Sequence, residues 1–416
     1  MNISLRSEIK QGLKQFVLVS LCSILTGLVV GVITAIFGRG LLWIGAFRSA
    51  HFYILIPFLA LAGLAIVYAY QHWAGEASKG MGLVFDMGHG RADKIPLRLI
   101  PLVTATTWLT HLFGGSAGRE GVAVQIGATV GHAMSRFVDF PNKSRLFLVM
   151  GMAAGFGGLF QTPFAAVLFA LEVLIVGSLQ IEALWAATLA GLISSQTSHA
   201  LGLEKFTFPV TVDLSLDMFT TLKLAGLGIC FGLAGHLFAW LLHWGKGRVA
   251  VLVPNPYKRI FVGGIALSLL LILLQQGRYS GLGTNLIEAS LAGQSIFTYD
   301  WLLKIFLTVL TLSLGFQGGE VTPLFAIGAS LGAILAVWFG LPVALVAALG
   351  YACVFGSATN TFLAPILIGG EVFGYANIPY FFVAMAFAYL VKPKTSIYSG
   401  QEKRTVPIIP SCFPKK

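Results

Sequence analysis

Long apolar windows without any Asp, Glu, Lys or Arg limit the fold of this chain more than any other feature. The longest runs from Val321 to Gly370, and Gly340-Leu-Pro342 is its natural turn. A run of ~20 apolar residues is enough to cross a bilayer as a helix. Several windows must therefore pair back to back, or stop partway and re-enter. Further windows of this kind are residues 15–38, 49–75, 146–171, 183–203, 224–245, 260–277 and 372–391.

The composition supports a polytopic membrane protein. The chain is 56% hydrophobic and 10% charged, with a mean hydropathy of +0.84, whereas a soluble domain has roughly 25% charged residues. The net charge of +11 does not indicate nucleic acid, because the basic residues lie between the apolar windows and at both ends, as in cytoplasmic loops. We therefore expect membrane lipid as the surroundings, no nucleic-acid partner, and both termini in the cytoplasm.

The stretch Gly114-Gly-Ser-Ala-Gly-Arg-Glu-Gly-Val-Ala-Val-Gln-Ile-Gly127 places Arg119 and Glu120 within apolar sequence. An ionisable residue at membrane depth is a functional-site hypothesis by default. Residues 122–130 read as a short helix, which puts Glu120 at a helix N-terminus, where unpaired N–H groups favour an anion. Broken helices of this kind face anions in secondary transporters. Since adjacent helical residues point apart, we expect no permanent ion pair between Arg119 and Glu120.

An internal repeat relates the two parts of the chain. Ile126-Gly-Ala-Thr-Val-Gly131 reappears as Ile327-Gly-Ala-Ser-Leu-Gly332, a shift of 201 (327 − 126). Gln161-Thr162 with Glu172-Val173 is echoed by Asn360-Thr361 with Glu371-Val372, a shift of 199 (371 − 172). Repeats that each contain a broken helix place a binding site where the two halves meet.

No metal or disulfide spacing emerges from the cysteines and histidines, so we expect no metal and no cofactor.

The apolar windows and the internal repeat predict a division of the chain into five parts. The predicted parts are a cytoplasmic N-terminal segment (1–14), a first membrane repeat (15–202), a linker (203–216), a second membrane repeat (217–392), and a C-terminal segment with a cytoplasmic tail (393–416), to which the family resemblance given next assigns a pore-lining part.

Four ordered motifs resemble those of the CLC chloride channels and anion/proton antiporters. They are Gly114-Gly-Ser-Ala-Gly-Arg-Glu-Gly121, the run from Gly155 to Glu172, Gly315-Phe-Gln-Gly-Gly-Glu-Val-Thr-Pro323, and Tyr398. The resemblance implies an all-α polytopic membrane protein, built from two inverted-topology repeats of tilted and broken helices. It also implies a homodimer with one anion pathway per subunit, in which Glu120 is the gating glutamate and Tyr398 closes the cytoplasmic side.

Several departures from the common family pattern resemble the fluoride/proton antiporter branch, which consists of bacterial exporters. Met81, in Ser78-Lys-Gly-Met-Gly82, stands where most of the family has a chloride-holding serine. Val122 replaces a proline, and Val173 replaces the internal proton glutamate. Glu320 and Thr322 stand where chloride transporters have apolar residues. This branch implies a location in the bacterial cytoplasmic membrane.

The predicted function is secondary active exchange of fluoride for protons, with export of cytoplasmic F⁻. A thioether cannot donate a hydrogen bond, so Met81 would remove a chloride-holding hydroxyl rather than add a fluoride ligand. Glu320 could hold a proton or accept a hydrogen bond from HF, or could simply face an aqueous vestibule. We assign gating and proton coupling to Glu120, Glu320 and Thr322, and the anion pathway and filter to Gly80, Met81, Gly118, Arg119, Gly121, Val122 and Tyr398.

A chloride/proton antiporter and a passive anion channel of the same fold remain open as alternatives. An intramembrane hydrolase is disfavoured, because no Ser/His/Asp set, zinc ligands or paired aspartates occur in the spans, so the chain is not expected to be an enzyme. Glu172 and Glu371 occupy equivalent repeat positions and are expected to be structural, each bonding backbone at its helix end. Lys304 carries no motif and is expected to lie at the membrane interface.

Overall fold

The first half of the chain is a series of helices joined by short turns. A computed structural model describes residues 3–212, 214–391 and 395–404, with side chains from Lys10 onward. The helical membrane fold predicted from the apolar windows is confirmed. The helices of this half are α1 (Ile3–Ala50), α2 (Phe52–Leu55), α3 (Leu59–Ala69), α4 (Met81–Gly88), α5 (Leu99–Leu112), α6 (Glu120–Met134), α7 (Lys143–Phe160), α8 (Pro163–Glu172) and α9 (Leu184–Ala200).

The second half repeats this arrangement with one long and seven shorter helices among the described residues. They are α10 (Met218–Leu252), α11 (Pro256–Leu273), α12 (Thr284–Leu291), α13 (Asp300–Leu314), α14 (Val321–Phe339), α15 (Val343–Thr359), α16 (Leu363–Phe373) and α17 (Ile378–Leu390). Single-turn and π-type helices are η1 (Ile56–Phe58), η2 (Tyr70–Ala74), η3 (Gly75–Lys79), η4 (Ser135–Phe137), η5 (Ile181–Ala183), η6 (Gln275–Gly277) and η7 (Tyr375–Asn377).

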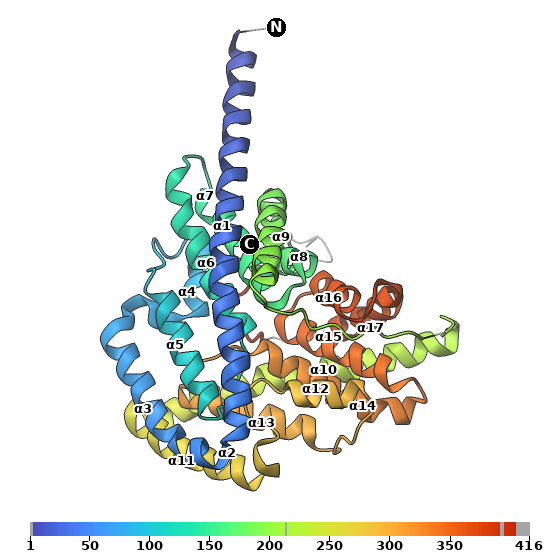
Figure 1. Cartoon of the computed structure of the whole chain (residues 1–416). Helices are drawn as coiled ribbons and strands as arrows, with labels where there is room; N and C mark the ends of the chain where they lie inside the picture. Colours follow the sequence, from blue (N-terminus) through green and yellow to red (C-terminus); the bar gives the residue numbers. More distant parts are fainter. Residues whose placement is uncertain (1–2, 213, 392–394, 405–416) are drawn as a thin grey trace, which may run out of the picture.

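Helix α1 is the longest element and projects beyond the other helices at its N-terminal end (Figure 1). It passes without a break through the predicted boundary at residue 14, so residues 3–14 continue the first helix. Five helical stretches in the described part are long and apolar enough to span a membrane, as expected for a multi-pass protein. They are Lys10–Ala50, Phe52–Gly88, Met218–Leu252, Pro256–Leu273 and Val321–Phe339.

Glycines at matching repeat positions bring two helix pairs into backbone contact. A Cβ on Gly127 of α6 would lie 2.1 Å from the carbonyl oxygen of Gly151 in α7. In the second half, a Cβ on Gly328 of α14 would lie 2.0 Å from the carbonyl oxygen of Gly350 in α15. Small residues let membrane helices approach this closely. The repeated Ile-Gly-Ala motif therefore encodes the same tight helix pair twice.

Two buried carboxylates connect the halves reciprocally. Glu172, at the end of α8, accepts hydrogen bonds from the backbone N–H groups of Phe362, Leu363 and Ala364 at the start of α16, at 2.6, 2.8 and 2.8 Å. Glu371 of α16 accepts from Ala165 N at 2.8 Å, at the start of α8. We expected each glutamate to bond backbone at its own helix end. Each instead caps the helix of the opposite repeat, because α8 and α16 lie against each other in opposite directions.

The segment that leads to Tyr398 returns to the first half. Strand β2 (Glu402–Lys403) pairs in parallel with β1 (Ile175–Val176). Ile397 N donates to Ala358 O at 3.1 Å, and Arg91 Nη1 lies 2.9 Å from Glu402 Oε1. Residues 395–404 are thereby tied to elements far apart in sequence. The remainder of the predicted C-terminal part, residues 393–394 and 405–416, lies outside the described residues.

No helix is present in the described residues of the predicted linker, between α9 and α10. Phe208 N donates to Val372 O, and Val210 N donates to Phe373 O, both at 3.0 Å. The connection between the two halves therefore runs extended along the end of α16 rather than standing free of the membrane domain.

Candidate anion and proton site

The two glycine-rich breaks meet directly. Gly118 N donates to Gly319 O at 2.6 Å, and Gly319 N donates to Gly118 O at 2.8 Å, which forms an antiparallel bridge between the halves. Helix α6 begins at Glu120, as the glycine pattern predicts, and α14 begins at Val321. Two helix N-termini, each with unpaired N–H groups, therefore face the same small region.

Glu120 is bound at the N-terminus of the opposite helix. Its side chain is fully buried, and its Oε2 accepts from Thr322 N at 3.1 Å and from Thr322 Oγ1. Arg119 N lies 3.4 Å from the same oxygen. The backbone N–H and hydroxyl of Thr322 are the kind of donors that bind anions at helix N-termini. The carboxylate of Glu120 thus occupies a position suited to a small anion.

The other oxygen of Glu120 is less well satisfied. Oε1 is buried and has no hydrogen-bond partner among the described residues, and Arg119 Nε is its nearest cationic atom at 3.5 Å. This contact corrects our expectation that the two side chains would point apart. Arg119 precedes the helix with φ −130° and ψ −27°, so the helical rule for adjacent residues does not apply. The Nε and Nη1 atoms of Arg119 are also buried without hydrogen bonds to described residues.

A cavity of about 260 Å³ lies next to this junction. It brings together Gly80, Met81, Glu320 and Tyr398, four of the residues that the sequence assigned to the anion pathway or to proton coupling. The other assigned residues do not line it: Val122 is buried within α6, and Gly118, Arg119, Glu120, Gly121 and Thr322 belong to the adjoining junction. Its lining is Ser78–Gly82, Phe85, Gln125, Lys246, Leu312, Gly315–Gly318, Glu320 and Ile397–Gly400.

Glu320 is only partly screened from solvent. Its side chain is 14% exposed, and its Oε1 lies 3.5 Å from Nζ of Lys246, which is 48% exposed. A Cβ on Gly121 would lie 3.7 Å from Glu320 Oε2, so this carboxylate also borders the first break.

Lys246 follows the apolar window 224–245, and the sequence analysis therefore placed it in a loop. It lies instead within α10, which continues to Leu252, so the lysine reaches the second break from a transmembrane helix.

Met81 and Gly80 form the start of α4 at the cavity wall. Gly80 has φ +53° and ψ −124°, a conformation that requires glycine. A Cβ there would lie 3.5 Å from Oε1 of Gln125, a buried oxygen without a hydrogen-bond partner in the described structure. The sequence analysis missed Gln125. Its only signal was an amide between apolar residues in the second turn of the helix.

Tyr398 closes the cavity on the side of the C-terminal segment. The ring is buried and packs against Phe85 and Phe169, at centroid distances of 5.2 and 6.4 Å. Its hydroxyl is buried and makes no hydrogen bond to any described residue. A phenol O–H without an acceptor is a donor available to an anion.

Lys304 supports the first break rather than a membrane interface. It is fully buried, and its Nζ donates to Ser116 Oγ, Tyr279 O and Gly281 O at 2.9, 3.0 and 2.8 Å. The expectation of an interfacial residue was wrong. The three acceptors come from two loops distant in sequence, so a single apolar window with one lysine gave no sign of them.

Comparisons with known proteins give one consistent result. The family model described as voltage gated chloride channel matches residues 62–393. The chloride/fluoride channel protein of Pseudomonas syringae pv. tomato is 34% identical over 384 residues, which cover 91% of this chain and 84% of that protein. A crystal structure of a CLC-type fluoride/proton antiporter has a TM-score of 0.91 and 52% identity, and the match covers 93% of this chain and 98% of that chain.

A more distant solved structure agrees in fold. The crystal structure of a slow cyanobacterial Cl⁻/H⁺ antiporter has a TM-score of 0.81 at 20% identity, covering 92% of this chain and 96% of that chain. At this level of identity the likeness concerns the path of the chain. It supports the arrangement of the two repeats and carries no information about the transported ion.

Proposed function

Because the chain belongs to the voltage gated chloride channel (CLC) family, we propose that it is a secondary active transporter that exchanges fluoride for protons and exports cytoplasmic F⁻. We place it in the bacterial cytoplasmic membrane, as a homodimer with one pathway per subunit and both termini in the cytoplasm. The proposal of fluoride as substrate draws on the likeness to a CLC-type fluoride/proton antiporter at 52% identity and on the polar second break of this chain.

The observation that carries the proposal is that the Glu120 carboxylate accepts hydrogen bonds from the backbone N–H and the hydroxyl of Thr322. The backbone N–H and hydroxyl of Thr322 can bind either this carboxylate or a fluoride ion, but not both at once. Protonation of Glu120 removes its charge and weakens its charge-assisted hydrogen bonds. The protonated side chain then leaves, and fluoride takes the same donors. Alternate occupation by carboxylate and fluoride couples the two ions.

The incomplete pairing of Glu120 supports this exchange. Oε1 lacks a hydrogen-bond donor, so one oxygen is free to receive a proton without first breaking a bond. The residue also has no intrahelical role, since it is the first residue of α6. Its departure therefore costs the hydrogen bonds from Thr322, the long one from Arg119 N and the contact with Arg119 Nε.

Residues around the cavity fit the other requirements of a fluoride pathway. The Tyr398 hydroxyl is a buried donor without a partner among the described residues in the cavity wall, where it can hold a waiting anion and limit leakage. Glu320 can accept a hydrogen bond from HF, the weak acid that forms when fluoride meets a proton. Met81 offers no donor to chloride. We assign specificity to these three side chains together.

The test is a flux assay on the purified protein in liposomes, with fluoride- and chloride-sensitive electrodes. A pH gradient alone should drive fluoride uphill, and dissipating the gradient with a protonophore should stop it. Equal rates for chloride and fluoride would instead identify a chloride/proton antiporter. Fluoride movement without proton pumping would identify a passive channel, a result consistent with the name of the Pseudomonas syringae relative.

A further inference from the structure

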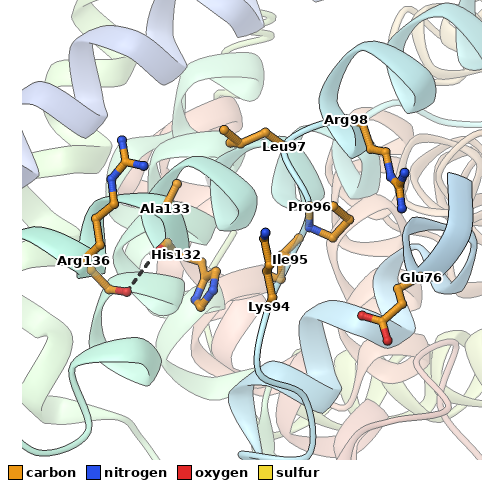
Figure 2. Close-up of a pocket in the computed structure, with 10 residues that line it drawn as sticks. Glu76, Lys94, Ile95, Pro96, Leu97, Arg98, His132, Ala133 and Arg136 are labelled. Carbon is orange, nitrogen blue, oxygen red and sulfur yellow. Dashed lines mark hydrogen bonds between the residues drawn. The ribbon is translucent and has the colours of Figure 1, made fainter. Parts of the chain in front are cut away.

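Two cavities outside the anion site have complementary chemistry. The first, which we call the basic cavity, has a volume of about 770 Å³. Figure 2 shows Lys94, Arg98 and Arg136 around it, with Glu76 at one side. The lining thus carries three positive charges against one negative. It consists of Glu76, Lys94–Arg98, His132, Ala133, Ser135 and Arg136.

The second cavity, which we call the apolar groove, runs between α3, α5 and α11 and has a volume of about 920 Å³. Most of its wall is aliphatic or aromatic, and the wall faces outward, since Ala105 of α5 is exposed. It is lined by Leu64, Ala65, Tyr68, Ala69, His72, Trp73, Arg98, Pro101, Leu102, Ala105, Thr106, Leu109 and Tyr257.

Arg98 lines both cavities and joins them. Tyr68, at the end of α3, and Trp73, in η2, line the groove together with Arg98. They are 49% and 60% exposed and pack edge to face. Exposed Tyr and Trp of membrane helices gather at the level of the lipid headgroups. The groove therefore lies within the hydrocarbon region and opens at headgroup level onto the basic cavity.

The basic side chains have no carboxylate partners in the part of the chain that the structure describes. Neither Lys94 nor Arg98 takes part in an ion pair there. The Cζ atom of Arg136 lies 4.8 Å from the centroid of the Phe137 ring, and Arg136 forms no ion pair with a described residue either. Glu76, the one carboxylate in the lining, forms no ion pair with them in the described structure. The three cations therefore repel each other unless a further anion lies between them.

We propose that the basic cavity and the apolar groove form one binding site for an anionic glycerophospholipid. The phosphate would lie among Lys94, Arg98 and Arg136, and an acyl chain would lie in the groove. Basic pockets between transmembrane helices at the membrane surface favour anionic headgroups, and the groove supplies the apolar area that distinguishes a lipid from free phosphate.

The site adjoins the filter. A Cβ on Gly75 would lie 2.4 Å from Nη2 of Arg98, so this arginine rests directly on the backbone that begins η3. That turn ends at Lys79 and is followed by Gly80 and Met81. The site also contacts the start of α5 and the end of α6. A bound lipid therefore links the filter segment to the helix that carries Glu120, and we expect it to stabilise both.

The experiment measures the thermal stability of the detergent-solubilised full chain during titration with phosphatidylglycerol, and separately with phosphatidylcholine of the same acyl composition. Phosphatidylglycerol should raise the melting temperature at lower concentration than phosphatidylcholine. The variant Lys94→Gln/Arg98→Gln/Arg136→Gln should need a roughly hundredfold higher concentration of phosphatidylglycerol, since each base near the surface strengthens anionic-lipid binding by about a factor of five. Inorganic phosphate at equal ionic strength should leave the melting temperature unchanged.

A matched control removes the same charge elsewhere. Lys10→Gln/Lys14→Gln/Arg248→Gln changes three exposed bases, none of which lines either cavity, and should keep the wild-type response. Ala105→Trp fills the groove and leaves the bases intact, so it should weaken the response to phosphatidylglycerol but not abolish its preference over phosphatidylcholine.

Three results would overturn the proposal. They are equal responses of the wild type to both lipids, an unchanged response in the cavity variant, and a stabilisation by inorganic phosphate as large as that by the lipid. If the cavity variant does not fold, lipid extracted with the purified wild type decides the question. Phosphatidylglycerol should then be enriched over its share of the membrane, and an unenriched composition would contradict the site. None of these outcomes depends on fluoride transport.

Discussion

Two pairs of glutamates lie between the repeats, and they are held very differently. Glu172 and Glu371 each accept two or three backbone N–H groups from the start of a helix in the opposite half. Glu120 is equally buried, yet only one of its oxygens is hydrogen-bonded. Glu320 faces a partly exposed lysine. Glu172 and Glu371 thus make equivalent contacts in the two repeats, and both of their carboxylate oxygens accept hydrogen bonds. Glu120 and Glu320 make different contacts, and one oxygen of Glu120 accepts no hydrogen bond.

This difference separates fixed carboxylates from movable ones. Removing a carboxylate from several backbone donors leaves buried N–H groups unpaired, which is costly. Glu120 accepts all of its hydrogen bonds on one oxygen, and in the proposed mechanism fluoride satisfies the Thr322 donors once the side chain leaves. Burial alone therefore does not distinguish Glu120, the proposed transport residue, from Glu172 and Glu371. The fraction of satisfied oxygen atoms does.

The sharpest test of the comparison is Glu120→Gln beside Glu172→Gln. Glu120→Gln should abolish fluoride accumulation driven by a pH gradient, because the amide cannot alternate between a charged and a neutral state. Glu172→Gln should retain the proton-to-fluoride ratio of the wild type in whatever protein folds. Both are measured in proteoliposomes with a fluoride electrode and a pH dye. Uphill fluoride transport by Glu120→Gln would remove the proposed role of this side chain.

A second test concerns stability. Glu172→Gln should lower the free energy of unfolding by about 2 kcal/mol, since charged hydrogen bonds contribute ~1.5–3 kcal/mol and the amide N–H₂ would face N–H donors. Glu371→Gln should cost less, because Glu371 accepts two backbone hydrogen bonds where Glu172 accepts three. Thermal unfolding in detergent gives the order. The reverse order would mean that the caps are not the dominant contribution.

Thr322→Val should slow coupled fluoride transport about tenfold. The change removes the hydroxyl donor and keeps the backbone N–H, and a typical hydrogen bond contributes ~1 kcal/mol, or more when the acceptor is charged. Thr322→Ser keeps the hydroxyl and is the matched control, so it should restore most of the rate. Initial rates of fluoride efflux measure both, and a serine variant as slow as the valine variant would point to packing instead.

Lys246→Gln should have a smaller effect, a change of a few-fold at most. The lysine is half exposed, and exposed ion pairs contribute only ~0–1 kcal/mol. The effect should shrink further in high salt, because solvent-exposed charges are screened. Fluoride flux at two ionic strengths measures this. A tenfold loss that persists in high salt would place Lys246 in the pathway itself.

The smallest expected effect concerns His89. This histidine lies next to Glu402, an exposed carboxylate at the end of the segment that carries Tyr398. Its Oε2 lies 3.5 Å from His89 Nδ1, and His89 Nε2 contacts Gly400 O at 3.1 Å. Burial lowers the pKa of His89 below its ordinary value of 6.5, Arg91 and Arg145 lower it further, and Glu402 opposes them.

Because the native state takes up a proton at His89 less readily than the unfolded chain, its contribution to stability is intact above about pH 6.5 and falls as the pH drops below that value. Thermal unfolding at pH 7.5 and 5.5 measures the loss. His89→Gln should show a smaller difference between the two pH values. An identical difference in the variant would assign the pH dependence to other groups.

Much of the fold follows from sequence because the apolar windows and the repeated glycine motifs are local signals. Glu120 at a helix start was predictable from the glycines before it and the helical run after it. Gln161 and Asn360, which repeat at a constant shift, both end helices with positive φ, at 57° and 55°. Their repetition thus reflects two equivalent helix ends.

What sequence could not supply are contacts between distant segments. The Gly118–Gly319 bridge, the three acceptors of Lys304 and the approach of Lys246 to Glu320 each join residues from separate helices or loops. No periodicity encodes which charge in one apolar window faces a break in another. The mistaken positions of Lys246 and Lys304 have this common origin: the first was assigned to a basic loop between two apolar windows, and the second to the membrane interface.

The glycine contacts between α6 and α7, and between α14 and α15, have a consequence for the transport cycle. Helices whose main chains touch have no side-chain layer between them that could deform, so sliding one past the other would require both pairs to separate. Sliding of these helices within each half is therefore expensive here. In the proposed transport cycle, movement inside each half is then left to rotations of individual side chains, so turnover should respond to changes at single rotamers.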